Sequence, residues 1–299
     1  MRVVDTLMDL DDKAGRGERF DRLDAERVLA EPDLVSIGLL GEAARRRASQ
    51  DVVTFGRVSE VAGGAPAEPG AAGELRVMGR PASIDEACRW VRSAADVAAG
   101  TPLTGLSLTD LLDLCGGDGA TMREAAHALR SAGLESVAEV PLDRFESTAE
   151  AISTVQAIVD AGLHAWRWTI DQAGADARLD LLMRAADMQA ATHAARAFAP
   201  LPRRDSPDQP STGYDDVRTV TVAKLVCVAI PFIQVDWPSY GPKLAQVAIA
   251  FGANDIDGIA PVDPPDLGPR RTPVEDISRQ IRAASGTPAE RNGRYERRA

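Results

Sequence analysis

Apolar residues recur along this chain at two spacings, and the two spacings alternate. Leu244, Val247, Ala248 and Phe251 follow the i, i+3, i+4, i+7 pattern of a helix that packs on one face, and Gly252 suits its end. Short runs rich in valine, isoleucine and tryptophan predict strands. Helices are predicted over residues 84–98, 122–132, 152–161, 178–197, 216–228, 242–251 and 274–284, and strands over 52–55, 75–78, 134–140, 166–170, 232–237 and 256–260. Residues 106–114 fit either state.

This alternation of strand and helix predicts βα units around a parallel sheet. With six or seven candidate strands, we predict an α/β fold of the TIM-like β/α barrel type, partial in extent. Residues 1–50 are predicted to form an N-terminal helical segment, 51–267 the partial barrel, and 268–299 a C-terminal extension that packs on or near it. Residues 63–73 and 200–212, rich in Gly, Pro, Asp or Ser, are predicted to be exposed loops.

The most distinctive stretch runs from Phe251 to Gly258, where a helix end meets clustered carboxylates. On a strand, Asp255 and Asp257 would share one face. Two carboxylates on one strand end can bind cationic or hydroxyl groups of a ligand, or raise one another's pKa. They can also simply stabilise a turn, as Asp residues commonly do.

Composition narrows the functional classes. The 299 residues carry a formal net charge of -11, which argues against nucleic acid or an anionic membrane surface as a partner. The longest apolar run, residues 225–233, contains Pro231 and is too short to span a membrane. No signal peptide is visible at the N-terminus, so a cytoplasmic location is expected. Cys88, Cys115 and Cys227 are widely separated, and local spacing predicts neither a disulfide framework nor a metal site.

Leu34, Ile37, Leu40 and Ala44 predict a helix in the N-terminal segment, which ends in three consecutive arginines, Arg45, Arg46 and Arg47. Cations suit the C-terminal end of a helix dipole, which is the simpler explanation of the run. Arginine clusters also attract phosphate, and this is the alternative.

Several motifs resemble those of the radical S-adenosylmethionine (SAM) enzymes that include aminofutalosine synthase, with dehypoxanthine futalosine cyclase and FO synthase as relatives. Residues 251–258 resemble the Gly-Ala-Asn-Asp-x-Asp-Gly signature, and residues 237–248 resemble a Trp-x-x-x-Gly-x-x-x-Ala-Gln-x-Ala segment. Residues 217–225 resemble a Leu-Arg-x-x-Ala-x-x-Arg-Leu helix, with Lys224 in place of arginine. Residues 198–201 and 286–295 resemble Phe-x-Pro-Leu and Gly-x-x-Pro-x-Glu-Arg-x-x-x-Tyr.

The family uses a 4Fe-4S cluster and SAM, and holds the cluster with three cysteines at Cys-x-x-x-Cys-x-x-Cys after the first strand. Here the sequence after Phe55 contains no cysteine before Cys88. A glycine pair of the family corresponds to Gly79-Arg80, and a family glutamate corresponds to Glu139. The resemblance therefore indicates a degenerate homologue without the cluster motif, and no cofactor is predicted.

Two functions follow from this resemblance. The first is a non-catalytic partner or regulator in menaquinone biosynthesis by the futalosine pathway, paired with an intact radical SAM paralogue or with a second copy of itself. The alternative is a small-molecule (nucleoside- or enol-ether-like) binding protein, or an enzyme with cluster-independent chemistry that uses Asp255 or Asp257 as acid or base. No catalytic residue and no metal ligand is predicted. The predicted ligand-binding residues are Asn254, Asp255, Asp257, Trp237, Gln246 and Arg291.

Overall fold

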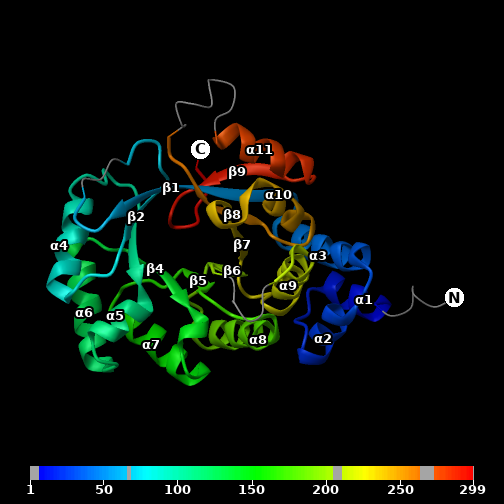
Figure 1. The fold of residues 1–299 in the computed structure, drawn as a ribbon, viewed down its shortest axis with the longest axis horizontal. Coiled ribbons are helices and arrows are strands. Elements are labelled where there is room, and N and C mark those ends of the chain that lie inside the picture. Colours follow the sequence, from blue (N-terminus) through cyan, green and yellow to red (C-terminus); the bar gives the residue numbers. More distant parts are fainter. Residues whose placement is uncertain (1–6, 66–68, 205–210, 263–272, 299) are drawn as a thin grey trace.

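The computed structural model describes residues 7–65, 69–204, 211–262 and 273–298. Eight parallel strands form a ring with helices around its outside (Figure 1). The ring runs in order from β2 to β8 and closes through β1, which pairs with both β8 and β2. The strands are β1 (Val52–Ala62), β2 (Glu74–Met78), β3 (Leu103–Ser107), β4 (Ser136–Pro141), β5 (Arg167–Ile170), β6 (Ala197–Pro202), β7 (Phe232–Asp236) and β8 (Asp255–Ile259).

This architecture confirms the predicted TIM-like barrel, with a ring that is closed and not partial. Helices follow most strands, and several begin with a side chain that accepts a hydrogen bond from the first turn, among them Ser83, Asp118, Ser147 and Asp236. The helices on this part of the chain are α4 (Ile84–Ala95), α5 (Leu108–Leu114), α6 (Gly119–Ala132), η1 (Leu142–Arg144), α7 (Thr148–Asp160), α8 (Ala175–Thr192), α9 (Gly213–Val226) and α10 (Trp237–Ala250). No helix in the described ranges is long and apolar enough to cross a membrane.

Three N-terminal helices, α1 (Met8–Arg16), α2 (Arg22–Ala30) and α3 (Leu34–Ser49), pack beside α9 and α8. Asp33 caps α3 through the backbone N–H groups of Val35 and Ser36. Phe20, in the link between α1 and α2, is fully buried. These helices therefore extend the apolar core on one side of the barrel, to the right in Figure 1.

The C-terminal segment enters the barrel sheet. After α11 (Pro273–Ala283), strand β9 (Thr287–Arg291) pairs in parallel with the first half of β1, while the second half of β1 pairs with β2. Tyr295 then stacks on Phe232 at the start of β7, with 5.5 Å between ring centroids. The extension therefore covers the N-terminal end of the barrel.

The structure differs from the sequence-based predictions in three strands, β1, β6 and β9, and it settles one ambiguous segment. Strand β6 lies where the prediction had a helix end and an exposed loop, because His193 adopts a left-handed backbone that ends α8 early. Residues 106–114 divide into the end of β3 and helix α5. Strand β1 continues to Ala62, well past the predicted end at residue 55, and β9 was not predicted.

Candidate functional site

Charged side chains fill the axis of the barrel. Because side chains alternate along a strand, every second residue points inward, and Glu74 with Arg76 on β2 and Asp255 with Asp257 on β8 follow this rule. All four are at least 95 % buried. Isolated charges would be very unfavourable in such a place, so their mutual pairing is essential.

Asp255 lies in the lower layer, nearer the N-terminal end of the barrel. Its two carboxylate oxygens accept hydrogen bonds from Nε and Nη2 of Arg291 at 2.7 and 2.9 Å. Thr54 and Gln234 donate to the same carboxylate at 2.5 and 2.6 Å. The C-terminal extension thus supplies the guanidinium that neutralises the charge of this carboxylate, through the bidentate hydrogen bonding that arginine favours.

Asp257 lies one layer higher and contacts three arginines. Arg291 Nη2 donates to it at 2.8 Å, Arg76 Nη1 lies 3.0 Å from its Oδ2, and Arg167 Nη2 lies 3.5 Å away. Burial opposes ionisation of Asp257, but the guanidiniums of Arg76, Arg167 and Arg291 outweigh it and hold the pKa of this carboxyl far below its ordinary value. Asp257 is therefore a permanent anion at neutral pH.

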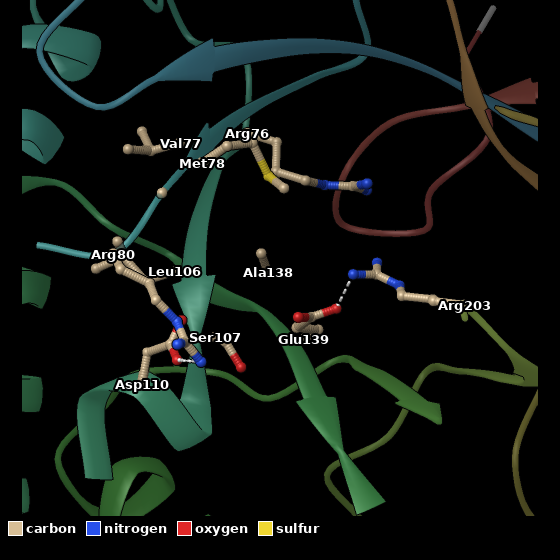
Figure 2. Close-up of a pocket in the computed structure, with 11 residues that line it drawn as sticks. Arg76, Val77, Met78, Arg80, Leu106, Ser107, Asp110, Ala138, Glu139 and Arg203 are labelled. Carbon is tan, nitrogen blue, oxygen red and sulfur yellow. Dashed lines mark ion pairs between the residues drawn. The ribbon is translucent and has the colours of Figure 1, made fainter. Parts of the chain in front are cut away.

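A hollow of about 220 Å³ opens above this network, at the C-terminal ends of β2, β3 and β4 (Figure 2). Arg80 Nη2 lies 2.7 Å from Asp110 Oδ1, and Arg203 pairs with Glu139 on the other side. Burial, and secondarily the charge of Arg167, lowers the pKa of Arg203. The lining residues are Arg76, Val77, Met78, Gly79, Arg80, Leu106, Ser107, Asp110, Ala138, Glu139 and Arg203.

A second hollow of about 410 Å³ continues from the first and shares Arg80, Ser107, Asp110 and Glu139 with it. Its other lining residues are Thr109, Pro141, Arg144, Asp171 and Arg204. We call the two hollows together the barrel mouth. They lie where ligands bind in barrels of this type.

The barrel mouth is cationic although the chain is acidic. Five arginines line it against three carboxylates, in a protein of net charge -11. Arg144 is exposed and makes no hydrogen bond or ion pair with the described residues. A focused positive region of this kind attracts anionic ligands.

Two buried polar atoms on β5 lack a hydrogen-bond partner in the part of the chain that the structure describes. Arg167 Nη1 and Thr169 Oγ1 are buried and make no hydrogen bond with the described residues. Both residues belong to the inward-facing set of β5, since Arg167 contacts Gln234 on β7. Buried donors without a partner are unfavourable, so a ligand or a water is expected beside them.

The structure places the six predicted ligand-binding residues at different points. Asp255, Asp257 and Arg291 come together in the axial network, where their polar atoms already serve one another. Asn254 accepts from Ile233 N at 2.8 Å and donates to Pro231 O at 3.0 Å, and so holds the turns before β7 and β8. Trp237 and Gln246 are half-buried on α10. Ligand binding by these six residues stays a prediction.

Sequence reasoning missed two arginines of the site, Arg76 and Arg167. Arg76 lies between Leu75 and Val77 on β2, and Arg167 lies between Trp166 and Trp168 at the start of β5. A charged residue within an apolar strand indicates a side chain that points into the barrel. This signal was present in the sequence. Gly79-Arg80 and Glu139, which the family resemblance had singled out, do line the barrel mouth.

The residues present do not fit an iron–sulfur cluster. Cys88, Cys115 and Cys227 are buried on separate elements, and burial raises the pKa of each thiol. Within the described ranges no three His, Cys, Asp or Glu side chains are grouped as metal ligands. Where the cluster loop of the family is expected, β1 continues as a strand, and its Arg57 pairs with Glu290 on β9.

Sequence comparison with known proteins finds relatives of the kind that the motifs resemble. The chain is 24% identical over 96% of its length to an aminodeoxyfutalosine synthase of Streptomyces coelicolor, of which it covers 93%. That alignment spans 362 positions, more than the 299 residues of this chain, so the relative contains segments that this chain lacks. No known protein-family profile matches the sequence.

Solved structures show the same fold. Methylornithine synthase superimposes with a TM-score of 0.66 at 13% identity, over 94% of this chain and 97% of that one. The hydrogenase maturase HydG of Carboxydothermus hydrogenoformans superimposes with a TM-score of 0.67 at 8% identity, over 95% of this chain and 79% of that one. At these identities the likeness concerns the fold alone.

Proposed function

We propose that this divergent homologue of aminodeoxyfutalosine synthase has lost the radical reaction and binds a small anionic metabolite at the barrel mouth. The observation that carries the proposal is the course of β1, which continues as a paired strand without cysteine where the cluster loop is expected. The place expected for the cluster loop is thus taken by a strand, and the barrel mouth is lined mainly by cations.

Cluster-independent catalysis by Asp255 or Asp257 is the less favoured alternative. A general acid or base works best with a pKa near the working pH. Three arginines hold the pKa of Asp257 far below that range, and Asp255 accepts hydrogen bonds on both oxygens. Binding without turnover is the better match to this geometry.

Iron and sulfide analysis after anaerobic reconstitution tests the loss of the cluster. The Streptomyces coelicolor relative, treated in parallel, serves as the positive control. We expect no stoichiometric iron or sulfide in this protein. A stoichiometric cluster with the matching absorption spectrum would refute the proposal.

A thermal-shift screen of carboxylated nucleosides and carboxylated enol ethers tests the binding site. A ligand of the barrel mouth is expected to stabilise the wild type and to stabilise Arg144→Ala less, because Arg144 has no ion-pair partner among the described residues. Arg89→Ala, on the exposed face of α4, is the matched control. Equal stabilisation of all three proteins would place the ligand elsewhere.

A non-catalytic role also implies a partner. We propose that the chain supports an intact radical SAM paralogue in menaquinone biosynthesis, by binding a metabolite that the paralogue makes or uses. Co-expression of the two proteins and size-exclusion chromatography, with and without the metabolite, tests this role. Separate elution under both conditions would leave only the binding role.

A further inference from the structure

A second group of cations lies outside the barrel, where α3 and α9 pack together. Arg45 on α3 is fully buried, and none of its three guanidinium nitrogens has a hydrogen-bond partner among the described residues. The nearest carboxylate oxygen, Glu42 Oε1, is 3.9 Å from its Nη2. Lys224 on α9 is 95 % buried and makes no hydrogen bond or ion pair with the described residues.

Lys224 lines a small pocket at the junction of α1, α3 and α9. Arg47 lines it as well, together with the small residues Ala14, Gly17, Ala44 and Ala48 and with Glu18, Leu225 and Val228. Gly17 has a positive φ of 71°, and a Cβ there would lie 1.5 Å from Arg47 Nη2. The missing side chain therefore lets the Arg47 guanidinium lie against the end of α1.

Two cations, Lys224 and Arg47, and one carboxylate, Glu18, line the pocket. Burial, followed by the charges of Arg45 and Arg47, lowers the pKa of Lys224 to about 8. Glu18 is committed to Arg16, whose Nε donates to it at 2.6 Å. The C-terminal ends of α1, α3 and α9 carry partial negative charge, but neither Lys224 nor Arg45 donates to a carbonyl there within the described ranges.

We propose that this pocket binds a small oxyanion of the phosphate or sulfate class, held by Lys224 and Arg47 with the charge of Arg45 close by. The free volume of about 30 Å³ admits an ion of a few atoms and excludes a nucleoside. A bound oxyanion supplies the hydrogen-bond acceptor that the buried Lys224 ammonium lacks among the described residues. It also ties the N-terminal helices to α9, which makes it a structural ligand distinct from the metabolite at the barrel mouth.

Calorimetric titration with inorganic phosphate, at constant ionic strength set by chloride, tests the proposal. The wild type is expected to bind phosphate and to unfold at a higher temperature when phosphate is present. Lys224→Met is expected to weaken binding about ten- to hundredfold, because it removes a charge-assisted hydrogen bond. Lys224→Arg keeps the charge and should keep binding, and Lys243→Met on the exposed side of α10 is the control.

The variants also separate this site from the barrel mouth. If Arg144→Ala abolishes phosphate binding while Lys224→Met keeps it, the anion binds at the barrel mouth and the proposal is wrong. Equal stabilisation of wild type and Lys224→Met by phosphate, or by chloride alone, would overturn it as well. Loss of cluster and metabolite binding are measured separately and do not depend on these outcomes.

Discussion

Asp257→Asn is the substitution that most directly probes the axial network. The asparagine keeps the shape of the side chain but removes the one anion that faces Arg76, Arg167 and Arg291 together. Breaking a fully buried ion pair by removing one partner costs about 3–5 kcal/mol. We therefore expect the free energy of unfolding to fall by about that amount, measured by urea unfolding followed by circular dichroism.

Asp110→Asn is the matched control, because Asp110 pairs with an Arg80 side chain that is 74% exposed. Asp110→Asn is expected to lower the free energy of unfolding by less than about 1 kcal/mol.

The pH dependence of the free energy of unfolding gives a second test of Asp257. Since the pKa of Asp257 in the folded protein lies below its ordinary value of 3.8, its contribution to stability is present above about pH 4 and is lost as the pH falls below it. Asp257→Asn should lack this part of the acid sensitivity. A loss below about 1 kcal/mol, or an unchanged acid profile, would refute the reasoning.

Three further substitutions probe other parts of the fold. In phosphate-free buffer, Lys224→Met should raise the free energy of unfolding by about 3 kcal/mol at neutral pH, because the pKa of Lys224 falls from 10.5 to about 8 on folding. The wild type should gain stability between about pH 8 and 10.5, where only the unfolded chain holds the proton, and the variant should not. Gly56→Ala brings a Cβ within 2.7 Å of Arg291 Nη1 and should cost about 1–3 kcal/mol in urea unfolding, whereas Gly119→Ala, with nothing within 4 Å, should not destabilise. Arg294→Ala removes a partly exposed ion pair to the start of β4, and a loss above about 1 kcal/mol would show that this pair holds the extension.

The barrel could be predicted from the sequence because most of its helices and strands carry their own signals. Helices that end at Gly133 and Gly162, and strands such as β7 with its run of buried residues, repeat at regular intervals. Strand β6 carries no such signal. Its Ala-Phe-Ala-Pro sequence follows an alanine-rich helix, and only pairing with β5 and β7 makes it a strand.

The site was less predictable because its residues meet only through the closed ring. Asp255 and Asp257 could be found from their spacing on one strand, and Arg291 from a motif in the C-terminal segment. Nothing in the sequence indicates that Arg291 donates to both carboxylates, since the contact depends on β9 pairing with β1. The burial of Arg45 likewise follows from packing against α9, which a run of three arginines does not reveal.

The pairing of β1 with β9 also sets an order for folding. Strands β2 and β9 pair with the same edge of β1. β9 pairs with the first half of β1, and β2 pairs with its second half. The contact between Arg57 and Glu290 spans 233 positions of the chain, and such distant contacts form slowly. Until β9 arrives, the edge of β1 is unpaired and Asp255 lacks its cation. During synthesis, an almost complete barrel would therefore expose a strand edge that can pair with other chains.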